Sequence, residues 1–222
     1  MNSRDTTLCI FAKAPRAGAV KTRLAATIGA DAAAQLADAF FWDTLEVAEK
    51  LASVRVVVAL SGNELLLPAL RDRVDVWHQG EGDLGARLQR NLRRALTESP
   101  RVLAVGTDSP GLPVALLEQA LVALDTHDAV LGPADDGGFY LLGTRKCPEG
   151  LLSGLPWSSA DTRERTLARL EERGLSVALL APWFDVDRER DLERLRTLLV
   201  AGEIHAPATC RVLGIRPEGV AQ

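Results

Sequence analysis

The first loop of the sequence has the residue types of a phosphate-binding site. Lys21, Thr22 and Arg23 follow a short apolar run and a turn-like segment at 13–18, and they stand at an apparent helix start. Backbone amides, a helix N-terminus and cationic side chains together suit a di- or triphosphate. Two residues separate Gly18 from Lys21, so the segment is not a Walker A loop. Taken alone, such a basic loop is equally consistent with a solvated turn.

Three acidic residues further along the chain are candidate metal ligands. Asp108 directly follows an apolar run and precedes a turn, where a carboxylate can hold Mg²⁺ that also bridges phosphate oxygens. Asp185 and Asp187 stand where another strand is expected to pass into a helix, so that one can complete a metal site while the other caps the helix. A helix cap without metal binding is the alternative for these acids.

A glycine-rich loop at 78–88 is a candidate site for a nucleotide base. Gly80, Gly82 and Gly85 allow the backbone to approach a flat ligand closely just before a helix. A flexible turn in which Asp83 caps the helix is the alternative. The helix itself carries an expected solvated face of Arg87, Arg90 and Arg94, of which Arg87 alone is near the loop.

A second pair of acids, Asp135 and Asp136, stands with two glycines between two apolar runs. Adjacent carboxylates with room for a ligand can bind hydroxyls or act as a general base. An ordinary Asp-Gly hairpin turn is the alternative. Trp157 lies in a segment whose hydroxyl residues can contact an acceptor, although a loop followed by a helix cap explains the segment equally well.

These loops need a framework, and the apolar patterns predict one. Apolar runs typical of strands alternate with amphipathic helical patterns, which is the order of a mainly parallel α/β sheet. In such sheets, ligands bind beyond the carboxyl ends of the strands, where several loops converge. Two runs separated only by an Asp-Asp-Gly-Gly turn favour antiparallel pairing there. The expected strands are 7–12, 53–60, 74–77, 101–108, 128–134, 139–144 and 176–180, and the expected helices are 31–51, 64–71, 83–97, 114–124, 160–173 and 189–199.

Length and composition indicate one globular domain. The chain has 222 residues, of which 47% are hydrophobic and 25% charged. At roughly 150 residues per domain, this length predicts a single domain over 1–222, with a core at about 7–200 and a tail at 202–222. The tail either packs back on the domain or contacts a second subunit, so a homodimer is possible.

Charge and cysteine usage exclude several classes of partner and site. The formal net charge of −4 provides no basic field for a polyanion, so we expect no nucleic-acid partner. Cys9, Cys147 and Cys210 are far apart and show no metal-binding spacing, which argues against a disulfide framework or a zinc site and favours the reducing cytoplasm. No apolar run reaches about 18 residues, so we expect neither secretion nor a membrane span.

Taken in order, five segments resemble a bacterial family of nucleotide-diphospho-sugar transferase-like proteins, often labelled glycosyltransferases. The segments are FAKAPRAGAVKTRL, GDLGARL, GTDSPGLP, GPADDGGFYLLG and DVDRERDLERL. The resemblance spans about residues 7–200, and its third and last segments are shared with sugar-phosphate nucleotidyltransferases and phospholactate guanylyltransferase. It implies the glycosyltransferase A fold, a single-domain Rossmann-like mixed sheet flanked by helices.

The resemblance also implies roles for individual residues. It places the nucleotide against Lys13, Gly18, Lys21, Thr22, Arg23, Gly82, Asp83, Leu84 and Gly85. It makes Asp108 and Asp187 the metal ligands, and it puts Asp136, Gly137 and Gly138 on the acceptor side, where Asp135 and Trp157 are further candidates. One departure is that Ser109 and Pro110 follow Asp108, so the sequence lacks the usual DxD pair of acids.

The expected function is therefore a transferase that uses a nucleotide donor with Mg²⁺ or Mn²⁺. The leading hypothesis is a glycosyltransferase that moves a sugar from a nucleoside-diphosphate sugar to a small acceptor, with Lys21, Asp108 and Asp136 as the catalytic groups. The alternative is a nucleotidyltransferase that couples a nucleoside triphosphate to a phosphorylated small molecule and releases pyrophosphate. A nucleotide-binding module without turnover is a third hypothesis.

Overall fold

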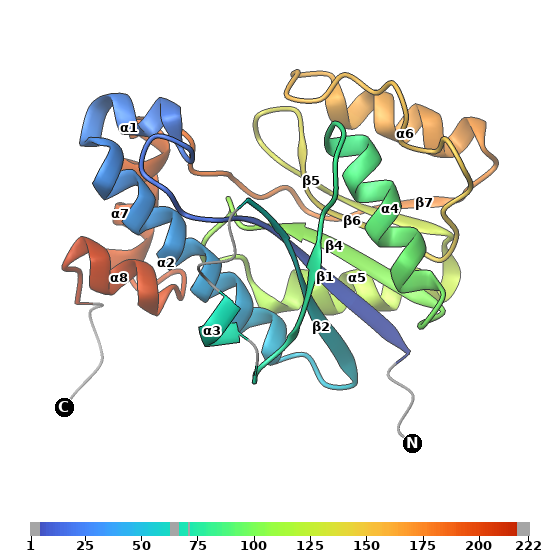
Figure 1. Cartoon of the computed structure of the whole chain (residues 1–222), viewed down its shortest axis with the longest axis horizontal. Helices are drawn as coiled ribbons and strands as arrows, with labels where there is room; N and C mark the ends of the chain where they lie inside the picture. Colours follow the sequence, from blue (N-terminus) through green and yellow to red (C-terminus); the bar gives the residue numbers. More distant parts are fainter. Residues whose placement is uncertain (1–4, 63–66, 71, 217–222) are drawn as a thin grey trace.

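A seven-stranded mixed sheet forms the centre of the molecule (Figure 1). The computed structural model describes residues 5–62, 67–70 and 72–216. The strand order is β3-β2-β1-β4-β6-β5-β7, in which β6 is antiparallel to both of its neighbours and the other pairs are parallel. The predicted mixed sheet, including its antiparallel pair, is confirmed. The strands are β1 (Thr6–Lys13), β2 (Val54–Ser61), β3 (Asp75–His78), β4 (Arg101–Gly106), β5 (Ala129–Pro133), β6 (Phe139–Thr144) and β7 (Val177–Leu179).

Helices connect the strands and cover both faces of the sheet. They are α1 (Thr22–Ile28), α2 (Ala30–Glu49), α3 (Leu67–Leu70), α4 (Leu84–Leu96), α5 (Val114–Thr126), α6 (Thr162–Glu172), α7 (Glu189–Val200) and α8 (Pro207–Leu213). Part of the helix expected at 64–71 lies outside the described residues, and α3 is the part that is described. Within the described residues, no helix combines the length and apolar character that a membrane crossing requires.

Alternation along β1 divides the core between the two faces. Leu8 and Ile10 pack in one cluster with apolar residues of α2 and α5, whereas Cys9 points to the opposite face and packs with residues of α4 and α6. This is the period of two that a strand covered on both faces must have, since successive side chains point to opposite sides. A third cluster joins α1, α2, α7 and α8 beside the sheet, on the left of Figure 1.

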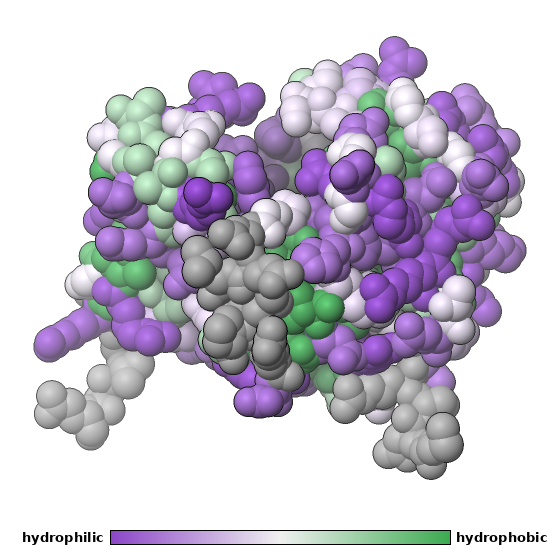
Figure 2. Space-filling view, viewed as in Figure 1, coloured by the Kyte–Doolittle hydropathy of each residue, from purple (hydrophilic) through white to green (hydrophobic). Residues whose placement is uncertain are grey.

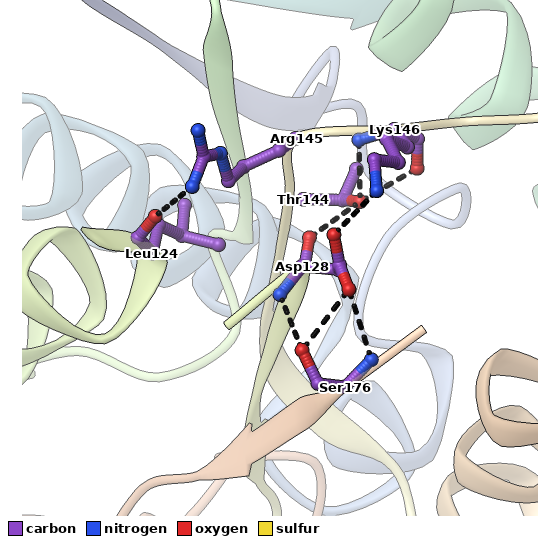
Figure 3. Close-up of polar contacts among 6 residues, drawn as sticks. All are labelled: Leu124, Asp128, Thr144, Arg145, Lys146 and Ser176. Carbon is purple, nitrogen blue, oxygen red and sulfur yellow. Dashed lines mark hydrogen bonds and ion pairs between the residues drawn. The ribbon is translucent and has the colours of Figure 1, made fainter. Parts of the chain in front are cut away.

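A polar network holds β5, β6 and β7 together at the edge of the sheet (Figure 3). The carboxylate of Asp128, just before β5, accepts hydrogen bonds from the backbone and hydroxyl of Ser176 and lies 2.8 Å from the Lys146 ammonium. The Thr144 hydroxyl donates to the Asp128 carbonyl oxygen at 3.1 Å. The hydrogen bond from Lys146 and those from Ser176 lower the pKa of Asp128 to about 2. These contacts link the start of β5 to the end of β6 and to the residue before β7.

The C-terminal segment, expected as a tail, contains a helix that is anchored by a buried carboxylate. Asp43 of α2 is 2% exposed and accepts hydrogen bonds from the backbone of Ala208 (2.7 Å) and Thr209 (2.9 Å) and from the Thr209 hydroxyl (2.5 Å). Burial raises the pKa of Asp43, while the three hydrogen bonds oppose this shift. The acceptor for the first amides of α8 comes from another helix, so the local sequence of α8 did not predict it.

We expect Asp43→Ala to destabilise the protein by about 1–3 kcal/mol, because three buried donors on α8 would lose their acceptor. Urea unfolding followed by circular dichroism measures the change. Asp31→Ala removes an exposed carboxylate from the same helix and should cost far less. Equal losses from the two substitutions would show that Asp43 does not anchor α8.

Candidate active site

The loop after β1 turns sharply to place Lys21 inside the molecule. Lys21 is the N-cap of α1 and has left-handed backbone angles (φ 47°, ψ 42°). A residue other than glycine in this region costs about 1 kcal/mol or more, and such strain is concentrated at functional sites. The side chain is only 4% exposed, although lysine is rarely buried unless it is paired. Lys21 is therefore positioned by the turn instead of extending into solvent.

The Lys21 ammonium lies between two carboxylates from distant parts of the chain. It forms an ion pair with Asp108, which follows β4, and lies 3.0 Å from Oδ1 of Asp187, which precedes α7. Burial disfavours the charged ammonium, but the two acids outweigh burial and raise the pKa of Lys21. Asp108 and Asp187 remain about half exposed, at 58% and 41%. This triad joins the predicted phosphate-binding loop to both predicted metal ligands.

Backbone contacts bring the two acids together. The amide of Val186 donates to the Asp108 carbonyl oxygen at 2.9 Å, which fixes the segment before α7 against the turn after β4. The N-cap of α5 is Pro113, so the helix-cap alternative for Asp108 is wrong. The cap predicted from Asp185 or Asp187 is also wrong, because Asp191 accepts from the amides of Asp187 (3.2 Å) and Arg188 (2.9 Å). Asp187 is thereby left to face the site.

Asp185 is a largely buried acid beside this triad. Its carboxylate accepts a hydrogen bond from the Ser109 hydroxyl, next to Asp108 in the chain. Burial raises the pKa of Asp185 to about 7, and the nearby charges of Asp108 and Asp136 act in the same direction, against the Ser109 hydrogen bond. The site therefore contains one carboxyl group that changes its charge near neutral pH.

A cleft of about 260 Å³ opens above the ends of β1 and β2 and contains the predicted phosphate-binding lysines. Its lining includes Lys13, Lys21, Leu84, Asp108 and Asp187. The Lys13 ammonium donates to the Ala19 carbonyl oxygen at 2.7 Å, within the loop that also holds Gly18 in a positive-φ conformation (77°). The cleft thus brings together residues from four of the five segments that carry the family resemblance.

Gln79, which the sequence interpretation missed, organises the floor of this cleft. Its side-chain amide donates to the carbonyl oxygens of Ala12 (3.0 Å) and Ala59 (2.8 Å), and its oxygen accepts from Arg87 (3.2 Å). Gln79 therefore ties the ends of β1 and β2 together and orients Arg87 toward the cleft. Arg90 donates to the Gln79 carbonyl oxygen at 2.6 Å, so the prediction that only Arg87 is near the loop is wrong.

The glycine-rich loop forms a capped turn that is packed closely from behind. Asp83 caps α4 by accepting a hydrogen bond from the amide of Ala86 at 2.8 Å, so the helix cap given as the alternative is confirmed. Gly82, just before it, has a positive φ of 99°. A Cβ on Gly85 would lie 2.3 Å from the Leu152 carbonyl oxygen and 2.7 Å from Nε1 of Trp157. Gly85 is therefore needed for packing against Leu152 and Trp157, tertiary contacts that its spacing did not reveal. Contact of Trp157 with an acceptor remains a prediction.

A second cleft, of about 350 Å³, lies on the other side of Asp187. It is lined by Arg23, Asp135, Asp136, Phe184, Asp185, Asp187, Arg188, Arg190, Asp191 and Arg194. Asp136 uses Oδ1 to accept from the amide of Gly138 (2.8 Å), which agrees with the turn alternative, and Asp135 lies 2.7 Å from Arg194. Figure 2 shows the mainly hydrophilic surface hollowed at the upper edge, between the part with α1 and α7 and the part with α6.

The β5–β6 turn lies at this cleft because it pairs with the extended segment before α7. The backbone of Trp183 pairs with both Pro133 (3.0 Å) and Asp135 (3.1 Å). Gly137 permits close packing, because a Cβ there would lie 2.0 Å from the Ala160 carbonyl oxygen. Arg23, predicted at the nucleotide, lines this second cleft, while Thr22 begins α1. Asp187 lines both clefts and is the residue they share.

Comparison with known proteins identifies the family. Residues 44–159 match a family described as uncharacterized proteins conserved in bacteria (DUF2064). The chain belongs to this family. A search of curated proteins found no match.

Several solved structures resemble this protein over most of its length. A protein from Desulfovibrio desulfuricans G20 with the provisional name nucleotide-diphospho-sugar transferase is 30% identical, covers 95% of this chain and 94% of its own, and has a TM-score of 0.85. Rv0371c from Mycobacterium tuberculosis, in complex with manganese, is 21% identical in sequence. The match covers 86% of this chain and 97% of the mycobacterial chain, with a TM-score of 0.54. A CMP:2-keto-3-deoxy-manno-octonic acid synthetase complexed with CTP is 14% identical in sequence. The match covers 90% of this chain and 100% of the synthetase chain, with a TM-score of 0.58. The predicted resemblance and fold are confirmed, and the last two likenesses concern the fold alone.

We expect Asp185→Asn to stabilise the metal-free protein at pH 8 and to have little effect at pH 4. Because the pKa of Asp185 is raised by folding from 3.8 to about 7, the folded state retains a proton that the unfolded state releases, and stability falls as the pH rises through this interval. Asparagine avoids the buried charge and keeps an acceptor for Ser109. The gain at pH 8 should be about 1–3 kcal/mol, or roughly 2–4 °C in Tm per kcal/mol.

Thermal unfolding in EDTA at pH 4 and pH 8 measures this difference. Asp72→Asn makes the same charge change at an exposed position and is the matched control. A stability gain that is equal at both pH values, or equal in the two variants, would contradict the prediction.

Proposed function

We propose that this protein is a divalent-metal-dependent glycosyltransferase that moves a sugar from a nucleoside-diphosphate sugar to a hydroxyl group of a small acceptor. The coarser assignment, a nucleotide-using transferase, is supported by the names of the similar structures. The single observation that carries the finer proposal is the position of Asp187, which stands with Asp108 and Lys21 between a cleft that contains two lysines and a cleft lined by aspartates and arginines. Donor and acceptor can then meet at one charged centre.

The two carboxylates fit Mg²⁺ or Mn²⁺ held together with a nucleotide. Within the described residues, no group of three or more His, Cys, Asp or Glu side chains forms a complete metal cage. Mg²⁺ is commonly bound by one or two carboxylates plus substrate phosphates, so Asp108 and Asp187 provide a sufficient protein share. The manganese complex of the mycobacterial protein of similar fold supports the same metal class. When bound, the ion would neutralise the charge that develops on a leaving diphosphate.

The chain's own residues would bind the donor in the first cleft. Lys13 and Lys21 would hold the diphosphate, and the capped turn at Gly82 and Asp83 would lie beside the base. Gln79 keeps Arg87 at the wall of the cleft, where its guanidinium can donate to the nucleotide. Binding of the phosphates and the base would then direct the anomeric carbon toward the second cleft.

Transfer to a hydroxyl requires that its proton be removed, and the second cleft has carboxylates for this step. The acceptor oxygen would form a bond to the anomeric carbon as the bond to the diphosphate breaks. Asp136, whose Oδ1 is engaged by Gly138, would receive the acceptor proton on its other oxygen. The nucleoside diphosphate would leave with the bonding electron pair.

Nucleotidyl transfer is the second candidate, and two observations favour it. Asp108 and Asp187 come from two different loops instead of a DxD pair, and Arg23 and Arg188 line the second cleft, where they suit a phosphorylated acceptor. In that reaction a phosphate oxygen would attack the α-phosphorus and release pyrophosphate, with no need for a base.

Phosphorus NMR with Mg²⁺ distinguishes these reactions. Pooled nucleotide sugars and pooled nucleoside triphosphates are incubated separately, each with a mixed acceptor extract. We expect nucleoside diphosphate from the sugar pool, and Asp108→Asn should reduce its formation by roughly 10²-fold or more. Asp31→Asn, an exposed change on α2, should retain activity.

Other outcomes assign other functions. Pyrophosphate from the triphosphate pool would contradict glycosyl transfer and identify a nucleotidyltransferase. Metal-dependent line broadening without any product in either tube would favour a nucleotide-binding module.

A further inference from the structure

The Lys21 ammonium occupies the space that a shared metal ion would need. Its Nζ contacts both Asp108 and Asp187, the latter at 3.0 Å, and it lies 5.6 Å from the centroid of the Phe40 ring. A Mg²⁺ ion bound by both carboxylates would lie about 2.0–2.1 Å from an oxygen of each. Both cations would therefore compete for the same two carboxylates, at a separation where like charges repel.

We infer that the Lys21 ammonium acts as a counter-ion for Asp108 and Asp187 and thereby weakens the binding of free metal. When a nucleotide binds, the ammonium moves from the two carboxylates to the phosphates. The inference rests on the proposed metal-binding role of Asp108 and Asp187. The inference adds that metal and nucleotide each increase the affinity for the other. The coupling arises because the Lys21 side chain leaves the carboxylates and binds the phosphates.

The energetics of the buried ammonium explain why free metal is disfavoured. A buried ammonium that loses its carboxylate partners is left with an uncompensated charge, which is unfavourable. A metal ion that enters alone would displace the 4%-exposed ammonium of Lys21 from both of its carboxylates. A diphosphate that arrives with the metal supplies replacement acceptors, so the same displacement no longer leaves the ammonium unpaired.

The position of Lys21 also permits this exchange. The side chain lines the first cleft together with Lys13, on the side where the phosphates are proposed to lie. Lysine has a flexible four-carbon stem and three donors, so its head can turn from one acceptor to another while the backbone stays in place. By linkage, any factor by which nucleotide raises metal affinity must equally be the factor by which metal raises nucleotide affinity.

The test is to titrate the full-length, metal-free protein with Mn²⁺. The electron paramagnetic resonance signal of free Mn²⁺ measures how much of the metal is bound. We expect Lys21→Met to bind Mn²⁺ alone about 10-fold more tightly than the wild type, within the usual range of coupling between sites. With mixed nucleoside diphosphates, corrected for Mn²⁺ bound by the nucleotides themselves, the increase in affinity should be smaller in the variant than in the wild type.

Lys13→Met is the matched control, because it removes the same charge from the same cleft while the Lys13 ammonium contacts the Ala19 carbonyl oxygen. Its affinity for Mn²⁺ should rise by less than about threefold, as expected for a screened charge at a distance. Lys21→Gln retains a hydrogen-bond donor for the acids and provides a second test if Lys21→Met does not fold.

Each remaining outcome overturns a defined part of the proposal. Equal or weaker Mn²⁺ binding by both Lys21 variants, relative to the wild type, would show that Lys21 does not oppose the metal. An equal increase in Lys13→Met would show a general charge effect and would also overturn the inference. If no protein bound Mn²⁺, with or without nucleotide, the proposed metal site itself would be wrong.

Discussion

The candidate site depends on the ion pairs between the buried Lys21 ammonium and two half-exposed carboxylates. Its three residues come from the loop after β1, the turn after β4 and the segment before α7. A buried lysine is tolerated because both acids compensate its charge, and the acids tolerate one another because the ammonium lies between them. The Val186 hydrogen bond to Asp108 joins two of these segments, and the ion pairs of Lys21 connect the loop after β1 to both.

The sheet explains how such distant segments meet. β1 and β4 are parallel neighbours, so that the loops following them leave from the same edge of the sheet. The antiparallel strand β6 returns the chain between β4 and β5, and the β5–β6 turn brings Asp135 and Asp136 to that edge as well. The segment before α7 pairs with the end of β5 and carries Asp187 between the two clefts.

Both clefts combine positive and negative side chains around Asp187. The first cleft presents Lys13 and Lys21, whereas the second presents Asp136 and Asp185 together with arginines such as Arg23. The raised pKa of Asp185 shows how burial among other acids changes the chemistry of a carboxyl group. Asp187 lies at the junction of the two clefts.

The sequence by itself determined most of the strands and helices, although not α8, and it indicated the loops in which the candidate site residues lie. The alternation of Leu8, Cys9 and Ile10 is local, and so is the Asp83 cap, because period and capping depend on residues a few positions apart. The tertiary structure alone decided that Lys21 joins Asp108 to Asp187, that Gln79 ties two strands together, and that Asp43 anchors α8. These contacts link residues that are far apart in the chain, so they depend on strand order and packing, which no local pattern of residues specifies.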